Sequence, residues 1–141
     1  MFVLDTNVVS ELRKVGFGKA DANVMAWAES ADAADLFVSA ITIMELELGV
    51  LSLERKDATH GAMLRSWLEH QVLPDFSGRT LAVDTAVAQC CARLHVPNNC
   101  WERDALIAAT ALVHGMTVVT HNGTDFKPSG VPLINPWEAR Q

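Results

Sequence analysis

The chain has 141 residues, half of them hydrophobic, which is the size and composition of one ordinary globular domain. Its 11 lysines and arginines against 17 aspartates and glutamates give a formal charge of -6, which excludes a protein that binds nucleic acid through overall positive charge. A cluster of carboxylates around a divalent cation would be neutralised locally, so a small basic rim for nucleic acid stays compatible with this charge.

The cysteines and the apolar runs exclude two further classes. Cys90, Cys91 and Cys100 are odd in number and lack a C-x-x-C spacing, which argues against a disulfide framework or a zinc site. The first residues lack the basic segment of a signal peptide, and the longest nearly apolar run, 105–113, is far shorter than the roughly 20 residues of a membrane span. We expect a cytoplasmic protein that does not enter the membrane.

Short apolar runs alternate with helical patterns along the chain. Each run is three to five residues long and is bounded by polar or turn-forming residues, as is typical of buried strands. The expected strands are 2–4 (FVL), 36–40 (LFVSA), 80–83 (TLAV), 116–120 (MTVVT) and a short strand in 132–135 (PLIN).

The helices between these strands are predicted from apolar spacing and from capping and stop residues. Pro74 is expected to end the fourth helix, and Gly115 is a C-terminal stop for the last one. The expected helices begin near Val8, near Asn23, at about Ile41 (running to Leu53), at a cap formed by Asp57 or Thr59, at Asp84, and at Asn98 or Asn99.

This alternation predicts a single α/β domain over residues 1–141, with a parallel sheet of about four to five strands flanked by helices. Ligands of such sheets bind beyond the carboxyl ends of the strands. Asp5 follows the first strand directly, and Asp125 lies five residues after Thr120 at the end of a later one. We therefore expect these two acids on one rim.

Two further acids lie in apolar helical stretches. Glu45 lies one helical turn after Thr42 in SAITIMELELGV, and Asp104 begins DALIAATALV, a pattern that is apolar all round and so central to the core. A lone buried carboxylate would lose several kcal/mol of hydration, so each needs a cation, a hydrogen-bond network or solvent in a cleft.

Each acid also has a purely structural interpretation. Asp5 can be an N-cap, in competition with Thr6 and Asn7, and Asp104 can be a first-turn acid favoured by the helix dipole. Glu45 can pair with an arginine, and Asp125 can shape a turn. Together, however, four acids at strand ends and on core helices of an apolar protein favour a shared metal.

The physics of such a cluster selects the metal and the chemistry. Carboxylates a few ångströms apart repel one another by several kcal/mol, and only a cation or protonation relieves this repulsion. Oxygen ligands select a hard ion, Mg²⁺ or Mn²⁺, which orients and deprotonates water for attack at phosphorus. The expected activity is that of a nuclease or a phosphatase.

Four motifs in order resemble the PIN-domain ribonucleases, and among them the VapC/FitB-type toxins of bacterial type II toxin–antitoxin pairs. The motifs are LDTNVVSEL, SAITIMELELGV with its T-x-x-E, RDALIAATALVHGMTVVTHN, and the closing DF…VPLINPW. They span nearly the whole chain.

The resemblance implies that Asp5, Glu45, Asp104 and Asp125 form an acidic site for Mg²⁺ or Mn²⁺. It also assigns a supporting role by hydrogen bonds to Asn7, Thr120 and Asn122. It implies an RNA substrate and a cognate antitoxin whose tail fills the active-site groove. We expect the cleavage to leave a 5′-phosphate. A homodimer through helices in the 41–73 region is expected as well.

Substrate contacts and alternatives are less sharply indicated. Arg13, Lys14 and Lys19 in and after the first helix, and Arg103 and Lys127 beside two of the acids, are candidate phosphate ligands, with solvated surface charge as the alternative. Trp101 is a candidate for stacking on a base and His121 for touching substrate, while Glu47 and Glu102 rank below the four acids. Rival functions are a metal-dependent phosphatase, although Asn7 stands where a haloacid-dehalogenase-like enzyme has its second Asp, and a non-catalytic binding module stabilised by metal.

Overall fold

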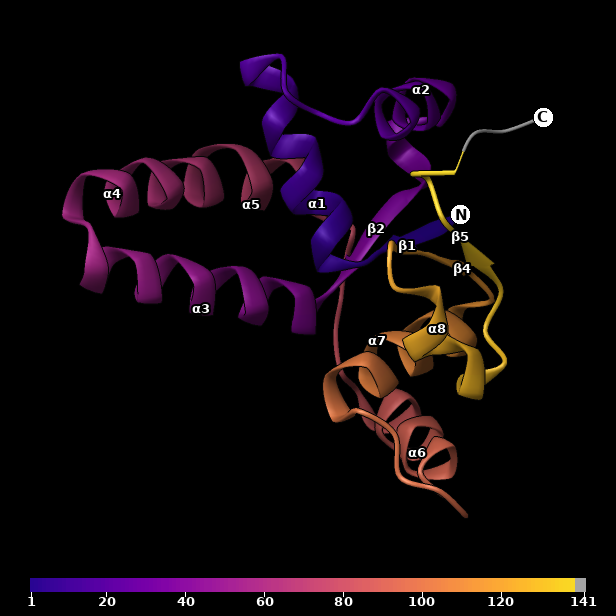
Figure 1. Cartoon of the computed structure of the whole chain (residues 1–141). Coiled ribbons are helices and arrows are strands. Elements are labelled where there is room, and N and C mark those ends of the chain that lie inside the picture. Colours follow the sequence, from indigo (N-terminus) through magenta and orange to yellow (C-terminus); the bar gives the residue numbers. More distant parts are fainter. Residues whose placement is uncertain (139–141) are drawn as a thin grey trace.

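Five short parallel strands form the centre of the molecule (Figure 1). The structure is a computed structural model that describes residues 1–138. The strands lie in the order β3-β2-β1-β4-β5, so the first strand of the chain is the middle of the sheet. Every neighbouring pair is parallel, which confirms the expected sheet. The strands are β1 (Phe2–Leu4), β2 (Leu36–Ser39), β3 (Thr80–Leu81), β4 (Thr117–Val119) and β5 (Leu133–Ile134).

Helices cover both faces of this sheet. In Figure 1 α1 and α2 lie above the strands, and α6, α7 and α8 lie below them. Within residues 1–138, no helix has both the length and the apolar character that crossing a membrane requires. The α-helices are α1 (Thr6–Arg13), α2 (Ala22–Ser30), α3 (Ala40–Lys56), α4 (Ala58–Trp67), α5 (Leu73–Asp75), α6 (Thr85–Leu94), α7 (Glu102–His114) and α8 (Gly123–Phe126). Shorter turns are η1 (Lys14–Phe17), η2 (Ala33–Asp35), η3 (Leu68–Val72) and η4 (Lys127–Ser129).

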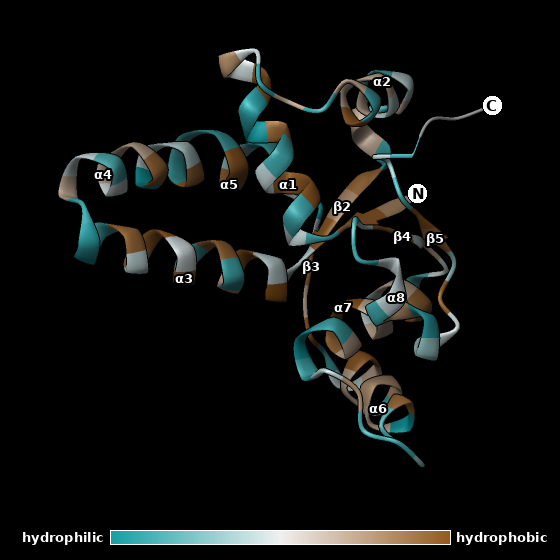
Figure 2. Ribbon diagram, in the orientation of Figure 1, coloured by the Kyte–Doolittle hydropathy of each residue, from teal (hydrophilic) through white to brown (hydrophobic). Residues whose placement is uncertain are grey.

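Successive residues of β1 are buried in two different cores. Leu4 packs with Trp27 of α2 and with apolar residues of α1 and α3, whereas Val3 packs with Ile107 of α7 and with Phe126 of α8. Both Val3 and Leu4 are fully buried. A strand covered on both faces has no solvent side, and this explains why its apolar residues are consecutive (Figure 2).

Two helix starts differ from the expected ones. Helix α1 begins at Thr6 and not near Val8, because the Asp5 carboxylate accepts a hydrogen bond from the Thr6 backbone N–H and caps the helix there. Helix α7 begins at Glu102 and not at Asn98 or Asn99, since those asparagines belong to a loop that precedes the helix.

The expected stop at Pro74 is also wrong by one residue. The chain continues from α4 through the π-helical turn η3 into α5, which ends at Asp75. Pro74 is the second residue of α5 and follows the π-helical turn by one residue. By contrast, the expected cap at Asp57 and the stop at Gly115, with φ of 67°, are confirmed.

Helices α3 and α4 form a long antiparallel arm that projects from the sheet (Figure 1). Arg65 of α4 joins the two helices: its guanidinium lies 2.6 Å from a Glu47 oxygen and 3.1 Å from a Glu54 oxygen. Its hydrogen bonds with these carboxylates raise the pKa of Arg65 above its usual value. The pairs fix the register of the arm, which holds Glu45 at its base.

Close packing at Gly61 gives a stability prediction for this arm. A Cβ at Gly61 would lie 2.5 Å from Glu54 Cα and 2.7 Å from Glu54 N, so α4 would have to move away from α3. We expect Gly61→Ala to lower the free energy of unfolding by about 1–3 kcal/mol, measured by chemical denaturation. Gly49→Ala is the matched control, because Gly49 is exposed on α3 with nothing within 4 Å of its Cβ position. This substitution should stabilise the protein slightly, since alanine favours the helix more than glycine does. Equal effects of the two substitutions would contradict the packing described.

Candidate functional site

Asp5 lies at the carboxyl end of the central strand, where β1 becomes α1. Its backbone N–H donates to the carbonyl of Val119 at 2.9 Å, so the end of β4 lies directly beside it. The side chain is 6% exposed. The sheet order puts β2 and β4 on either side of β1, and both strands run parallel to it. Residues that follow these three strands therefore meet at one edge.

Three hydrogen bonds hold the Asp5 carboxylate. Oδ1 accepts from the Thr6 backbone N–H at 2.8 Å, and Oδ2 accepts from Thr120 Oγ1 at 2.8 Å and from Asn7 Nδ2 at 3.3 Å. The Thr120 hydroxyl also accepts from the backbone N–H of Asn122 at 3.0 Å. Asn7 and Thr120 thus contact Asp5 through side chains, whereas Asn122 reaches this network through its backbone.

Glu45 reaches the same edge from the second turn of α3, which follows β2. Its Oε1 accepts a hydrogen bond from Thr6 Oγ1 at 2.7 Å, and the Thr6 hydroxyl also lies 3.3 Å from Thr42 Oγ1. On the other side, Arg103 Nη1 lies 3.8 Å from Glu45 Oε2. The structural interpretation of Glu45, an ion pair with an arginine, is therefore present in the structure. The two groups are far apart for an ion pair, and the Arg103 side chain is exposed.

Asp104 and Asp125 bring further negative charge to this edge. The pKa of Asp104 is raised from 3.8 to about 6. Burial is the main cause of this rise, and the charges of Asp5, Asp125 and Glu45 add to it. Burial likewise raises the pKa of Asp5, with contributions from Glu45 and Asp125, while hydrogen bonds from Thr120 and Thr6 oppose the rise. The four acids are thus electrostatically coupled, and each proton or cation bound at one affects the others.

The side chains of the four acids do not form a metal coordination shell in this structure. Within residues 1–138, no three His, Cys, Asp or Glu side chains converge closely enough to hold a metal ion. Glu45 points to Thr6 and Arg103, and Asp125 is solvent-exposed on the short helix α8. The donor set nevertheless fits a hard divalent cation, since its atoms are oxygens and its charges already oppose ionisation of Asp104.

The structure separates the lower-ranked acids from this edge. Glu47 is bonded to Arg65 on the arm, with its Oε1 2.8 Å from Arg65 Nη1. Glu102 is exposed at the start of α7 and raises the pKa of Cys91 of α6, behind burial as the main cause. Asp104 lies in the first turn of α7, where the helix dipole favours a negative charge. The structural interpretation of Asp104 and its place among the four acids are therefore compatible.

The candidate phosphate ligands fall into two groups. Arg13 lies at the far end of α1, about 12 Å along the helix from its start, with its guanidinium over the rings of Phe17 and Trp67. Lys14 pairs with Glu11 at 3.0 Å, and Lys19 lies beyond this same end of the helix. These three thus lie at or after the end of α1 that is opposite to Asp5.

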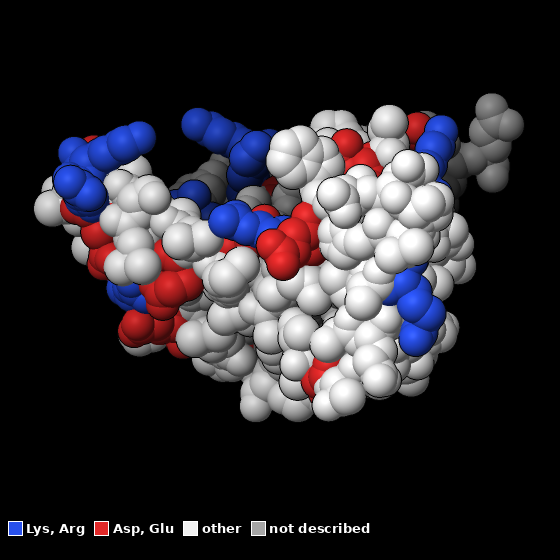
Figure 3. Space-filling view, turned by 90° about the horizontal axis from the view of Figure 1, so that it is seen from below, with Lys and Arg blue, Asp and Glu red and all other residues white. Residues whose placement is uncertain are grey.

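Arg103, in contrast, lies at the acids, and Lys127 follows Asp125 by two residues in the chain. Arg103 contacts Glu45, and Lys127 is exposed immediately after α8. Seen from below in Figure 3, acidic side chains lie beside basic ones near the middle of the face, and the surface to the right is mostly uncharged. The basic rim compatible with the net charge of the chain is therefore small and local.

His121 lies at the rim next to this network. Its backbone N–H donates to Asn7 Oδ1 at 3.2 Å, and its ring stacks on Trp137 with centroids 4.1 Å apart. One face of the His121 ring is therefore covered by Trp137.

Sequence reasoning missed Thr6 and Thr42 as parts of the site. Thr42 is fully buried, and Thr6 was considered only as a helix cap. Both hydroxyls connect the start of α1 to Glu45 across a large sequence separation. The only signal was indirect: Thr42 lies three residues before Glu45, so both fall on one face of α3.

Comparisons with known proteins agree with this geometry. The family model of the PIN domain matches residues 2–128. VapC ribonuclease Y4jK from Sinorhizobium fredii (strain NBRC 101917 / NGR234) is 36% identical, covering 98% of this chain and 99% of that protein. Toxin FitB from Neisseria gonorrhoeae (strain ATCC 700825 / FA 1090) is 36% identical, covering 97% of this chain and 99% of that protein.

A solved structure described as FitAB bound to an IR36 DNA fragment has the same fold. It superposes with a TM-score of 0.88 at 34% identity, covering 100% of this chain and 99% of that one. The match extends over the sheet, the helices and the α3–α4 arm. These likenesses confirm the resemblance carried by the four sequence motifs, and the chain therefore belongs to the PIN domain family, in the group that contains the VapC and FitB proteins.

Proposed function

We propose that this protein is the toxin of a toxin–antitoxin pair and a ribonuclease that hydrolyses RNA phosphodiester bonds with Mg²⁺ or Mn²⁺ held by Asp5, Glu45, Asp104 and Asp125. The observation that carries the proposal is the geometry at the carboxyl end of β1, where the buried Asp5 carboxylate is held by Thr120 and Glu45 reaches the same edge. Burial, and after it the charges of the other acids, also raises the pKa of Asp104 to about 6. The relatives named ribonuclease and toxin support the same activity.

The residues around the acids have distinct roles in this proposal. Thr120, Asn7 and the Asn122 backbone fix the orientation of Asp5, so that one of the four ligands is rigid. A bound cation would activate water for attack at phosphorus and offset the charge on the leaving oxygen. Arg103 pairs with Glu45 at a long distance in this structure. If Glu45 bound the metal instead, the Arg103 guanidinium would be released to bind a substrate phosphate.

The partner in this proposal is a cognate antitoxin whose tail fills the groove at the acids. Solved structures with the same fold are described as FitAB on a DNA fragment and as FitAcB from Neisseria gonorrhoeae, and they support a protein partner. A homodimer through the α3–α4 arm is part of the proposal as well. The arm exposes several large apolar side chains that a second copy could bury, namely Met44, Leu48, Leu51 and Met63.

The test compares RNA and a small phosphate ester as substrates. Purified protein with Mn²⁺ or Mg²⁺ should cleave RNA but not p-nitrophenyl phosphate, and EDTA should abolish the cleavage. Asp5→Asn should fold with an unchanged circular dichroism spectrum and lose the activity, and sequencing of RNA ends after induced expression should show new ends for the wild type alone. Hydrolysis of p-nitrophenyl phosphate would favour a phosphatase, and stabilisation by Mn²⁺ without any cleavage would favour a binding module.

A further inference from the structure

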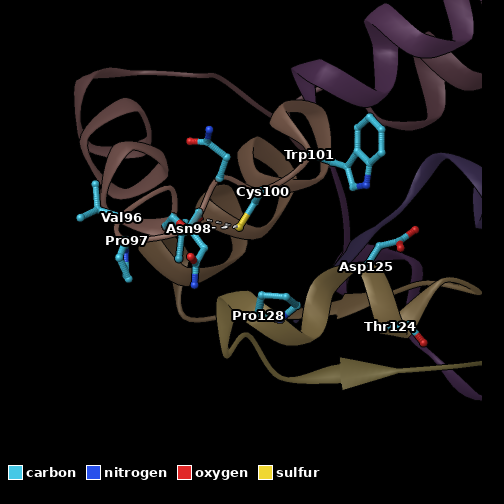
Figure 4. Close-up of a pocket in the computed structure, with 10 residues that line it drawn as sticks. Val96, Pro97, Asn98, Cys100, Trp101, Thr124, Asp125 and Pro128 are labelled. Atoms are coloured by element: carbon cyan, nitrogen blue, oxygen red, sulfur yellow. Dashed lines mark hydrogen bonds between the residues drawn. The ribbon is translucent and has the colours of Figure 1, made fainter.

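A surface cavity of about 600 Å³ lies beside the acids, between the loop 95–101 and the α8 segment (Figure 4). This volume is within the range of about 300–1,000 Å³ typical of ligand sites. In Figure 4 Val96 and Pro97 lie at one end of the cavity, and Trp101 and Asp125 lie next to each other at the other end. The wall is therefore apolar at one end and acidic at the other.

Trp101 is unusual among the tryptophans of the chain because 77% of its surface is exposed. Trp27 is buried, and Trp67 and Trp137 are partly buried. An exposed indole at the entrance of a cavity offers a flat stacking surface that the fold itself does not use. Val96, at the other end of the cavity, is also 76% exposed.

The loop that presents Trp101 is held in place by its own hydrogen bonds. The backbone N–H of Cys100 donates to His95 Nδ1 at 3.1 Å, and Cys100 Sγ donates to the Leu94 carbonyl at 3.2 Å. Between these anchors, Asn98 and Asn99 line the cavity with amide groups that can both donate and accept. A flat aromatic face beside amide groups is the combination that recognises an unpaired nucleobase.

The cavity is continuous with the acidic site. Asp125 lines it and also contributes to the raised pKa values of Asp5 and Asp104. Trp101 precedes Asp104 by three residues, and Lys127 follows Asp125 by two. A ligand in the cavity would thus contact Asp125 and lie beside the proposed scissile phosphate.

We propose that the 95–101 loop and α8 form a subsite that binds an unpaired RNA base next to the cleaved phosphate, with Trp101 as the stacking platform and Asn98 and Asn99 as hydrogen-bonding partners. This inference rests on the proposed ribonuclease function. It makes the subsite a determinant of which RNA is cut, because only an unstacked base can enter it.

The experiment measures binding and cleavage separately. Binding of a short single-stranded RNA of mixed sequence that carries a fluorescent label is followed in EDTA by fluorescence anisotropy, and cleavage is followed in Mn²⁺. Trp101→Ala should weaken single-stranded binding by about 5- to 150-fold, the range expected for loss of one base–aromatic stack. It should raise KM and leave kcat largely unchanged, whereas Trp101→Phe should keep most of the affinity.

Two controls make the outcome specific. The same RNA annealed to its complement should bind with an affinity that depends little on Trp101, because paired bases cannot stack on it. Val113→Ala, which removes an exposed apolar side chain at the other end of α7, should change neither binding nor cleavage.

The outcomes separate this inference from the ribonuclease proposal. Wild-type protein that cleaves RNA while Trp101→Ala binds and cleaves equally well would overturn the subsite and leave the nuclease intact. Absence of cleavage by the wild type would instead count against the nuclease, and Trp101-dependent binding in EDTA would still support a base-binding surface.

Discussion

Asp104→Asn should lower the rate of RNA cleavage in saturating Mn²⁺ by on the order of a thousandfold, while it makes the metal-free protein more stable. The loss of rate follows from removing one oxygen ligand and its charge, since a catalytic metal contributes several kcal/mol of transition-state stabilisation. The gain in stability follows from the raised pKa of about 6, because an acid with a higher pKa in the folded state opposes folding when it is ionised.

The pH dependence of this gain has a definite sign. Between about pH 4 and pH 6 the folded protein holds a proton on Asp104 more tightly than the unfolded chain does, so the contribution of this group to stability falls as the pH rises. Above about pH 7 Asp104 is ionised in the folded protein, and the full free-energy cost of this ionisation to folding is present. After allowance for partial solvent exposure it is about 1–2 kcal/mol, or a few degrees in Tm.

Thermal unfolding in EDTA at several pH values checks this prediction. The Tm difference between Asp104→Asn and the wild type should grow from pH 5 to pH 8. Asp84→Asn is the matched control: Asp84 caps α6 and does not contribute to the raised pKa of Asp5 or Asp104, and asparagine caps a helix as well as aspartate does, so neither Tm nor cleavage should change. A variant Asp104→Asn that is less stable than the wild type at pH 8 would contradict the coupling of the four acids.

Thr120→Val should destabilise the protein and also shift the pH dependence of its activity. The substitution removes the hydroxyl that donates to Asp5 Oδ2 and accepts from the Asn122 N–H, and it leaves both groups buried or half-buried without this partner. The expected cost is about 1–3 kcal/mol, measured by denaturant unfolding in EDTA. Because the Thr120 hydrogen bond lowers the pKa of Asp5, its loss should raise that pKa further, and the acidic limb of the rate profile should move to higher pH.

Thr110→Val is the matched control for this experiment. Thr110 is equally buried, but its hydroxyl donates only to the Leu106 carbonyl within α7, so its removal leaves no acid without a donor. It should change stability little and leave the pH profile in place. A pH profile that is the same for Thr120→Val and the wild type would argue that Asp5 does not titrate in the active form.

The strands could be predicted from the sequence because burial on both faces leaves a local signal. Consecutive apolar residues such as those in 2–4 and 117–119 are found where they were expected. The order of the strands could not be predicted, since nothing local says that β1 lies between β2 and β4. That order is what gathers the acids, so the sequence predicted their convergence only through the general rule for parallel sheets.

Boundaries were less predictable where a polar side chain competes with its neighbours. Three adjacent candidates could cap α1, and the structure selects Asp5, which serves both as the cap and as a member of the acidic edge. The asparagines at 98 and 99 look like caps in the sequence, yet they line a cavity because the 95–101 loop is anchored at Cys100. A capping residue in a sequence shows where a helix can begin, and tertiary contacts decide whether it does.

The sequence singles out the candidate acids more clearly than the candidate cations. Four carboxylates in an apolar chain are conspicuous because burying them is costly. Basic side chains on a helix surface carry no such signal, and the structure places Arg13 at the end of α1 away from the acids. Thr6 and Thr42 were missed since a buried threonine is also common in ordinary cores.

Calorimetric titration with Mn²⁺ in the absence of RNA tests the central claim most directly, namely that Asp5, Glu45, Asp104 and Asp125 share one divalent cation. The wild type should show saturable binding, and Asp5→Asn and Asp104→Asn should each weaken it by at least about a hundredfold, while Asp84→Asn binds as the wild type does. Equal Mn²⁺ affinity in all four proteins, or no binding by the wild type, would contradict the account.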